Sequence, residues 1–412
     1  MINNFTFEQL KKIEKEYGEA FYLLDSGVFE KNYMDLINEF RGIYPKSNIA
    51  YSYKTNYIPK LCKIVDKLGG YAEVVSDMEY ELAKKIGVKD KDIYFNGPYK
   101  RNWAVERLLI DGGIVNVDSI DDWNQIKDIA LKNNNSKLNI GLRCNFDIND
   151  GTISRFGIDV DSPDFSVFLS ELNEIKNVSL VGLHIHFASR SIETWPNRVN
   201  GIIDIYNNFF KNYNIKFISL GGGLFGRMPI EMRKQFSSEI PTFNQYAKIA
   251  ATAFANNFST YNEINKPELL LEPGTALAGD SMRFVSKVVS IKEVQKKLIA
   301  TLTGSIYNIN PTLNKINPPI NIISGNNKKI TGNIDFAGFT CIESDYLYRG
   351  YVGDISKGDY VIFSNVGSYS IVLKPPFILP NYSVIDVSNI DNIELIKEKE
   401  LFEDVFKTYI WN

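Results

Sequence analysis

The sequence predicts an α/β fold in which a parallel TIM-type (β/α)8 barrel is joined to an antiparallel β-barrel domain. Strand-like and helical runs alternate from residue 31 to about residue 275. Short β-rich runs, separated by Asn, Pro and Gly clusters, follow Gly279. The length of 412 residues also exceeds what one ordinary core fills.

The barrel is predicted from eight short runs that are rich in β-branched and aromatic residues. These runs are Asn48–Tyr53, Tyr71–Val75, Asp92–Phe95, Ile114–Val117, Leu138–Arg143, Leu180–Phe187, Phe217–Leu220 and Glu268–Leu271. Helical patterns lie between most of them, for example Met78–Ile86, Trp103–Ile110, Ile120–Leu131 and Phe243–Phe258. An open doubly wound sheet is the alternative, but no GxGxxG motif follows the first strand.

The second domain is expected to combine both ends of the chain. Residues 1–20 have the pattern of a short amphipathic helix, and the strand Ala20–Leu24 belongs to no repeating unit. Strand-like runs resume beyond the barrel at Arg283–Ile291, Leu298–Ile306, Lys329–Phe336, Asp359–Ser364 and Ser370–Leu373. We therefore predict a barrel domain of residues 31–275 and a β domain of residues 1–30 and 276–412, which Ala20–Leu24 would join.

The composition narrows the classes of partner. The formal net charge is −3 and no basic block occurs, so nucleic acid is not an expected partner. The three cysteines form no CxxC motif, which gives no basis for a disulfide framework or a zinc site. Met1–Phe5 lacks a charged region followed by an apolar core, and no run of 18 apolar residues occurs. We expect a cytoplasmic protein without a membrane partner.

Catalytic groups of (β/α)8 barrels gather at the carboxyl ends of the strands. The residues at the predicted ends are Lys54, Glu73, Ser76, Asn96, Gly97, Asp118, Ser119, Arg143, His184, His186, Gly221, Gly222, Gly223 and Glu272. Lys54 ends the first strand, where partial loss of water would favour the neutral, nucleophilic amine. A solvated lysine at a strand end is the alternative, and nothing local decides between the two.

The two histidines of the chain, His184 and His186, are two residues apart. On a strand they would point to the same face, as two metal ligands could. No third ligand stands at a convincing spacing, so we favour one packed histidine and one in a site, with no metal.

Two further strand ends carry residues suited to an anionic cofactor with a ring nitrogen. The seventh strand closes with three glycines, Gly221–Gly223, and the loop at this place in a barrel often holds a phosphate. The eighth strand ends in Glu272, a carboxylate after an apolar run that needs a partner. A protonated pyridine nitrogen would be such a partner, and a structural salt bridge is the alternative.

These features together make the chain resemble the fold-type III pyridoxal phosphate (PLP)-dependent decarboxylases, the group of diaminopimelate, ornithine and arginine decarboxylases. The resemblance runs from about residue 20 to residue 380 and follows the family's motif order. The matching segments are Tyr51–Asn56, Glu73–Ser76, Ser154–Gly157, His184–Ser189, the glycine run, Glu272–Gly274, Cys341 with Asp345, and Val366–Tyr369. These motifs in this order are far more specific than any one of them.

The resemblance implies a role for each matching residue. Lys54 would hold PLP as a Schiff base, Glu272 would keep the pyridine nitrogen protonated, and His186 would stack on the ring. Cys341 would reach the active site of a second subunit and return a proton, so complete sites would need a homodimer. The residues that would hold the cofactor are Lys54, His186, Ser189, Gly221, Gly222, Gly223, Glu272, Gly274 and Tyr369.

Two departures from the family pattern concern the substrate. Relatives acting on diaminopimelate usually carry arginine after Glu-Pro-Gly and before a Pro-x-Leu segment, whereas this chain has Thr275 and Asn310. Those arginines help to hold the distal carboxylate, and a neutral residue cannot replace a bidentate clamp. Glu343 and Asp345 are further substrate-binding candidates, which could bind a distal amine. A modified amino acid, or one attached to a carrier in specialised metabolism, therefore fits better than meso-diaminopimelate.

The expected function is α-decarboxylation of a small-molecule amino acid substrate. An amino acid racemase on the same barrel and a non-catalytic PLP-binding protein are the alternatives. The cysteine motif and the domain beyond residue 279 follow the decarboxylases, and small PLP carriers lack such a domain. We therefore favour a PLP-dependent carboxy-lyase.

Overall fold

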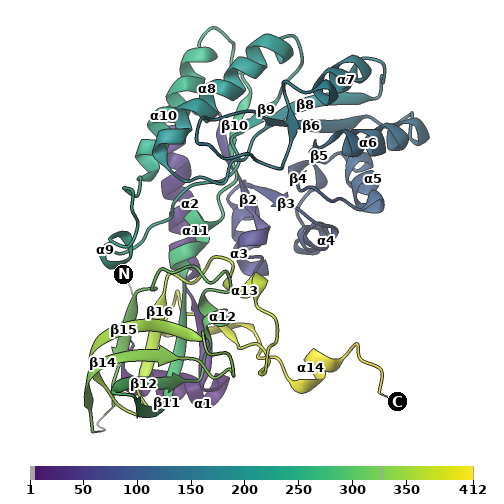
Figure 1. Cartoon of the computed structure of the whole chain (residues 1–412). Coiled ribbons are helices and arrows are strands. Elements are labelled where there is room, and N and C mark those ends of the chain that lie inside the picture. The colour runs from purple at the N-terminus through teal and green to yellow at the C-terminus, as the bar shows by residue number, and fades with distance from the viewer. Residues whose placement is uncertain (1–4, 326–327, 412) are drawn as a thin grey trace. The chain divides into compact units, whose positions relative to one another are not determined.

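The structure is a computed structural model that describes residues 5–325 and 328–411 (Figure 1). It divides into two compact units. The barrel unit comprises Glu30–Phe225 and Ile240–Ala276, and the β unit comprises Met1–Phe29, Gly226–Glu239 and Leu277–Asn412. The segment Gly226–Glu239 thus packs with the β unit although it lies between two barrel elements in the sequence.

Eight parallel strands close into a ring within the barrel unit, all of whose residues the structure describes. The strands are β2 (Ser47–Ser52), β3 (Tyr71–Val74), β4 (Ile93–Phe95), β5 (Ile114–Val117), β6 (Leu138–Asn145), β8 (Val178–His184), β9 (Phe217–Ser219) and β10 (Glu268–Leu271). Their order is β5-β4-β3-β2-β10-β9-β8-β6, and pairing of β5 with β6 closes the ring. A short strand, β7 (Ile158–Asp159), extends the edge of β6. The predicted (β/α)8 fold is confirmed.

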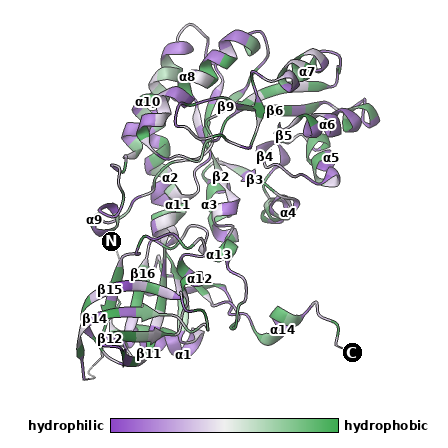
Figure 2. Cartoon of the chain, in the orientation of Figure 1, coloured by the Kyte–Doolittle hydropathy of each residue, from purple (hydrophilic) through white to green (hydrophobic). Residues whose placement is uncertain are grey.

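Helices follow the strands and cover the ring. The longer ones are α2 (Ser26–Arg41), α3 (Pro59–Lys67), α4 (Asp77–Ile86), α5 (Asn102–Ile110), α6 (Ile120–Lys132), α7 (Pro163–Leu172), α8 (Trp195–Ile205) and α10 (Phe243–Asn257). Each buries one stripe, as α6 does with Trp123, Ile126 and Ile129. In Figure 2 hydrophobic and hydrophilic residues alternate along the helices.

The interior of the ring is filled by side chains. Tyr94, Ile114, Phe217 and Leu270 form one buried cluster there, with the Tyr94 and Phe217 ring centroids 4.9 Å apart. Phe217 fits because Gly182 faces it: a Cβ at Gly182 would lie 1.9 Å from Cζ of Phe217. The ring is therefore a packed core, and polar groups are left for its ends.

The β unit is a mixed sheet with a helix packed on it. Its strands are β1 (Ala20–Leu24), β11 (Met282–Val294), β12 (Lys297–Leu302), β13 (Ile320–Ile323), β14 (Ile330–Ala337), β15 (Tyr346–Ile355), β16 (Tyr360–Ser364), β17 (Val384–Asp386) and β18 (Glu394–Lys397). The predicted joining of Ala20–Leu24 is confirmed, because β1 pairs with β11. Pairing is mostly antiparallel as expected, but β1–β17 and β12–β14 are parallel.

The predicted amino-terminal helix is described as α1 (Phe7–Tyr17), and residues 1–4 of that prediction lie outside the described residues. A capping box between Thr6 and Gln9 starts the helix. Leu10 and Ile13 then pack with Phe21 and Val285 in the main core of the β unit.

One predicted strand is wrong. Ser370–Leu373 forms a short helix, α13, instead of a strand. Tyr369 before it takes a left-handed conformation with φ of 62°, and the Ser370 hydroxyl donates to the Val366 carbonyl. A run of three apolar residues after a serine carries no periodicity that separates strand from helix, so the turn before it decides.

The remaining helices are short. They are α9 (Ile230–Arg233), α11 (Thr275–Ala278), α12 (Ile306–Ile309) and α14 (Phe402–Phe406). No helix within residues 5–325 and 328–411 has the length and apolar character needed to span a membrane.

Candidate active site

Lys54 lies at the carboxyl end of the first barrel strand, in the 3-10 turn Tyr53–Thr55 that follows β2. Register places Ser52 of β2 beside Glu73 of β3, which brings the Glu73 carboxylate under the lysine. The Lys54 Nζ atom donates to both carboxylate oxygens, at 2.8 and 2.6 Å. The Glu73 side chain is 1% exposed, whereas that of Lys54 is 38% exposed. The Lys54 amine is therefore anchored on Glu73, and its side chain is only partly buried.

Glu272 follows β10 and is buried among polar partners. The Ser219 hydroxyl donates to Oε1 at 2.7 Å, and His184 Nε2 lies 3.0 Å from Oε2. Burial alone would raise the pKa of Glu272, but His184 and Lys54 outweigh it and hold the pKa below its usual range. The carboxylate is therefore ionised at neutral pH.

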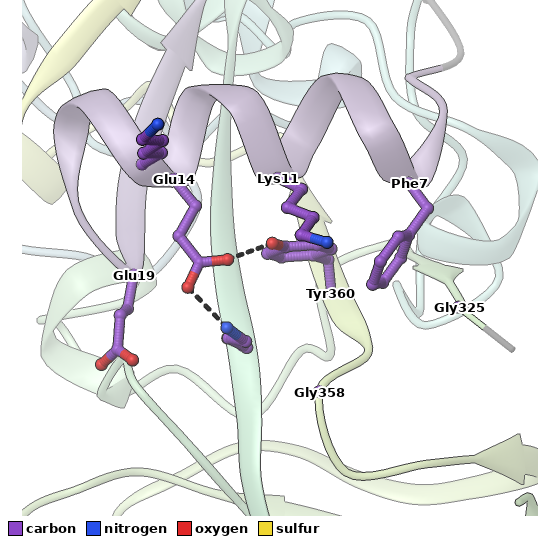
Figure 3. A pocket seen from close by; sticks show the side chains of 9 residues that line it. Phe7, Lys11, Glu14, Glu19, Gly325, Gly358 and Tyr360 are labelled. Atoms are coloured by element: carbon purple, nitrogen blue, oxygen red, sulfur yellow. Dashed lines mark hydrogen bonds and ion pairs between the residues drawn. The ribbon is translucent and has the colours of Figure 1, made fainter. Parts of the chain in front are cut away.

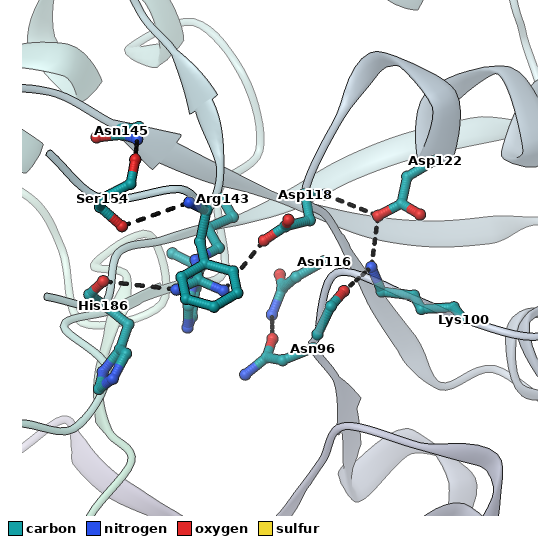
Figure 4. Close-up of polar contacts among 12 residues, drawn as sticks. Asn96, Lys100, Asn116, Asp118, Asp122, Arg143, Asn145, Ser154 and His186 are labelled. Carbon is teal, nitrogen blue, oxygen red and sulfur yellow. Dashed lines mark hydrogen bonds and ion pairs between the residues drawn. The ribbon is translucent and has the colours of Figure 1, made fainter. Parts of the chain in front are cut away.

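Asn96, after β4, links the two carboxylates. Its Nδ2 atom donates to Glu73 Oε1 at 3.0 Å and to Glu272 Oε2 at 3.1 Å. Asn116 fixes the direction of this amide by donating from Nδ2 to Asn96 Oδ1 at 2.6 Å (Figure 4). Asn116 itself needs Gly141 beside it, because a Cβ there would lie 1.8 Å from Asn116 Oδ1. The network therefore fixes the positions of both carboxylates.

His186 follows β8 and is held as a neutral ring. Its Nδ1 accepts the Gly222 N–H at 2.9 Å, which places any ring proton on Nε2. Burial, with Lys54 and Arg143 nearby, lowers the pKa of His186 to about 3. Arg143 also donates to the His186 carbonyl at 3.5 Å and pairs with Asp118 at 3.0 Å (Figure 4).

The glycine run after β9 leaves one backbone amide open. The Gly221 N–H donates to the Ser219 hydroxyl at 3.1 Å, and the Gly222 N–H is used by His186. The Gly223 N–H donates to no described residue. Gly223 has φ of +79°, and a Cβ there would lie 2.9 Å from the Ser189 carbonyl oxygen. The position therefore requires glycine and presents an amide with unused capacity.

Arg198 of α8 supports the loop that carries Ser189. Arg198 as a whole is 1% exposed, and its guanidinium donates to the carbonyl oxygens of Phe187, at 3.5 Å, and of Ser189. A Cβ at Gly223 would lie 2.9 Å from Arg198 Nη1, so the same guanidinium underlies the glycine run. Burial lowers the pKa of Arg198 to about 10, which still leaves it charged at neutral pH. No motif pointed to Arg198, because its role depends on two loops meeting.

The end of β10 packs against the turn of Lys54. A Cβ at Gly274 would lie 1.9 Å from Thr55 Oγ1, so glycine is needed for this approach. Thr275 Oγ1 accepts a hydrogen bond from Arg190 Nη2 at 3.3 Å. The structure thus places Lys54, His186, Ser189, the glycine run, Glu272, Gly274 and Thr275 in one unit, on strand ends and the loops after them.

The other predicted site residues belong to the β unit: Asn310, Cys341, Glu343, Asp345 and Tyr369. Cys341 and Glu343 are exposed, whereas Cys62 and Cys144 are buried. Asp345 accepts hydrogen bonds from Ser305 Oγ, Ile306 N and Thr340 Oγ1, at 3.0, 2.7 and 2.6 Å. Asp345 therefore shapes the loop that carries Cys341, and a substrate contact by Asp345 stays a prediction.

Two serines at strand ends have structural roles as helix caps. Ser76 and Ser119 are N-caps whose hydroxyls accept from Glu79 N–H of α4 and Asp122 N–H of α6. Among the residues that the structure describes, no group of three or more His, Cys, Asp or Glu is arranged to hold a metal ion.

Glu79 is a buried acid close to this network. Its Oε2 accepts the Val75 N–H at 2.8 Å, and burial raises its pKa from 4.5 to about 7. The folded state therefore binds a proton that the unfolded state releases above pH 4.5, so this contribution to stability is lost as pH rises towards 7. The full loss is about 3 kcal/mol.

Glu79→Gln should remove this dependence. We expect the difference in Tm between the variant and the wild type to shift in favour of the variant from pH 5 to pH 8. The reason is that a neutral amide carries no buried charge at pH 8, whereas Glu79 does. Glu81→Gln, at an exposed position of the same helix, is the control and should show no such gain. An equal difference between Glu79→Gln and wild type at both pH values would contradict the assignment.

A separate hollow of about 620 Å³ lies in the β unit. It is lined by Phe7, Lys11, Glu14, Lys15, Glu19, Lys287, Gly325, Gly358 and Tyr360 (Figure 3). Glu14 on α1 accepts hydrogen bonds from Lys287 and from Tyr360, which also line the hollow. These contacts tie α1 to the sheet, so we read them as structural.

The barrel residues fit PLP. The site has a partly exposed lysine side chain at Lys54, a Gly223 amide that donates to no described residue, and a neutral imidazole at His186. Three hydrogen-bond contacts use Glu272, while a carboxylate has about four acceptor positions, which leaves capacity for a protonated ring nitrogen. Lys54, His186, Gly223 and Glu272 would hold the cofactor's aldehyde, ring face, phosphate and ring nitrogen.

Comparison with known protein families decides the class. The family model "Pyridoxal-dependent decarboxylase, pyridoxal binding domain" matches residues 31–279. The chain belongs to the pyridoxal-dependent decarboxylases. Its cofactor is PLP and its reaction class is amino acid decarboxylation. This decides against the racemase and the non-catalytic carrier.

Relatives of this decarboxylase are similar over nearly their whole length. Diaminopimelate decarboxylase of Methanocaldococcus jannaschii is 27% identical over 416 residues, covering 96% of this chain and 92% of that protein. The L-glutamyl-(BtrI acyl-carrier protein) decarboxylase of Niallia circulans is 21% identical and covers 99% and 97%. A crystal structure of diaminopimelate decarboxylase from M. jannaschii has the same fold, with a TM-score of 0.84, 24% identity and coverage of 97% and 94%.

Proposed function

We propose that this decarboxylase acts on an amino acid other than free meso-diaminopimelate, with its cofactor held by Lys54. Thr275 is the observation that carries the proposal. It is a neutral residue where relatives acting on diaminopimelate carry arginine, and its hydroxyl accepts a hydrogen bond from Arg190. Asn310, at the second such position, donates from Nδ2 to the Asn314 carbonyl in its own loop at 2.8 Å. Neither residue supplies a clamp for a distal carboxylate.

A modified or carrier-linked amino acid fits this pattern best, because its distal carboxylate would be absent or esterified. The similarity to the L-glutamyl-(BtrI acyl-carrier protein) decarboxylase over 99% of this chain supports the proposal. Meso-diaminopimelate is the second candidate, because the 27% identical relative is named for it.

We assign cofactor binding to the barrel domain, residues 31–275, and a partner-directed cysteine to the β domain, residues 1–30 and 276–412. When bound, PLP supplies an aldehyde that captures the substrate amine and a ring that accepts the electron pair left by CO2. Glu73 and Asn96 position the Lys54 amine. Glu272, ionised and fixed by Ser219 and His184, holds a proton at the ring nitrogen. His186, neutral and fixed by Gly222, would pack against the cofactor ring without adding charge.

Release of CO2 from a panel of amino acids tests the proposal. The panel contains meso-diaminopimelate, L-lysine, L-ornithine, L-arginine, L-glutamate and an L-glutamyl thioester of a pantetheine carrier. We expect turnover of a substrate without a free distal carboxylate, with kcat/KM at least about tenfold above that for meso-diaminopimelate. A preference for meso-diaminopimelate would contradict it.

We also propose that the enzyme is a homodimer in which Cys341 completes the partner's site. Cys341→Ala should slow turnover about 10²-fold or more, because the proton donor is lost, and Ser344→Ala in the same exposed loop should not. Co-expression of Lys54→Ala and Cys341→Ala chains should restore about a quarter of wild-type activity, since half of random dimers carry one intact site. Activity no greater than the mean of the two variants would contradict shared sites.

A further inference from the structure

Arg190 carries a positive charge that has no ion-pair partner among the residues that the structure describes. It follows Ser189 in the loop after β8 and is half-buried. Its Nη2 atom donates to Thr275 Oγ1 at 3.3 Å, and its Cζ atom lies 5.5 Å from the Phe225 ring centroid. Among the described residues, no carboxylate forms an ion pair with Arg190. A guanidinium has five N–H donors, and the contacts with a hydroxyl and a ring face use few of them. Arg190 therefore has hydrogen-bonding capacity left for an anion.

The backbone of Arg190 is tied to the segment that follows the glycine run. Tyr246 of α10 donates to the Arg190 carbonyl at 2.6 Å and accepts the Phe225 N–H at 3.4 Å. One hydroxyl therefore holds both Arg190 and the chain that leaves Gly223. The Tyr246 ring is itself packed on Trp195, with centroids 4.8 Å apart, so this hydroxyl has little freedom.

The neighbours of Arg190 identify the kind of anion. Ser189 precedes it, and the open Gly223 amide lies against the Ser189 carbonyl. Arg198 is buried and donates to the Phe187 and Ser189 carbonyls, so Arg190 is the guanidinium of this loop that is left to contact an anion directly. An amide, a serine and one available guanidinium form a donor set for a phosphate.

We propose that Arg190 binds the cofactor phosphate and supplies, from the loop after β8, a positive charge that relatives can place at position 275. The contact between Arg190 and Thr275 puts the two positions within reach of one ligand. The proposal rests on the phosphate site assigned to the glycine run, but not on the identity of the substrate.

Cofactor affinity tests this role. Arg190→Gln keeps side-chain length and hydrogen-bonding groups but removes the charge. Apoenzyme is titrated with PLP and with pyridoxal, which lacks the phosphate, and binding is followed by absorbance. We expect the Kd for PLP to rise about 10- to 100-fold and the Kd for pyridoxal to change by less than about twofold. Arg107→Gln on the outer helix α5 is the matched control and should change neither.

A double variant tests whether a positive charge at position 275 can replace the one at position 190. Adding Thr275→Arg to Arg190→Gln should restore PLP affinity to within about threefold of wild type. Equal losses for PLP and pyridoxal would mean that Arg190 only shapes the loop, and would overturn the proposal. Unchanged PLP affinity together with a raised KM for carboxylate-bearing substrates would also overturn the proposal. A double variant that does not recover PLP affinity would overturn it as well.

Discussion

Replacing Lys54 with alanine is expected to abolish the visible absorbance of the bound cofactor and to lower kcat by about 10⁴-fold or more. In our proposal the amine is the nucleophile that holds the aldehyde, and it also pairs with the buried Glu73 carboxylate at 2.6 Å. Loss of activity in Lys54→Ala could therefore reflect lost chemistry or an unpaired buried charge.

Lys54→Arg separates the two causes. A guanidinium keeps the pairing with Glu73 but cannot form the covalent bond, so we expect wild-type thermal stability with no cofactor absorbance. Lys63→Ala, an exposed lysine of the following helix α3, is the control and should retain both absorbance and activity. Retained turnover in Lys54→Arg would contradict the role of Lys54.

Replacing Glu272 with glutamine is expected to lower kcat by about 10²- to 10³-fold while the cofactor remains bound. A neutral amide keeps the shape of the side chain but cannot stabilise a positive charge on a ring nitrogen. The Lys54 linkage is untouched, so reduction with borohydride should still label Lys54.

Glu268→Gln is the matched control for Glu272→Gln. Glu268 starts the same strand, β10, and its carboxylate accepts from Tyr71 at 3.1 Å, at the opposite end of the barrel from Glu272. This variant should leave kcat within about twofold of wild type. Equal losses in Glu268→Gln and Glu272→Gln would mean that the charge on Glu272 has no special function.

The barrel and the position of Lys54 could be predicted from the sequence because both depend on short-range pattern. Alternating strand and helix runs fix the order of the ring, and a residue that ends a strand lies at its mouth wherever the strand packs. Asn96 was found in the same way. Its link between Glu73 and Glu272 was not, because it joins the ends of β4 and β10, which are separated by two strands in the ring.

The contacts of loops could not be predicted. Arg190 and Arg198 act through carbonyls and hydroxyls of irregular segments, and no periodicity describes these. In the sequence, Thr275 shows only that the arginine of related enzymes is absent at this position. The structure places the Arg190 guanidinium against the Thr275 hydroxyl. Ser370–Leu373 shows the same limit on a smaller scale, since the left-handed Tyr369 decides its conformation.

The most direct test of the central claim is a chemical map of the lysine that carries the cofactor. Purified enzyme is reduced with borohydride, digested with trypsin and analysed by mass spectrometry. We predict a single phosphopyridoxyl adduct, on the peptide that contains Lys54. An adduct on another lysine, or an enzyme that turns over its substrate without any reducible lysine linkage, would contradict the account.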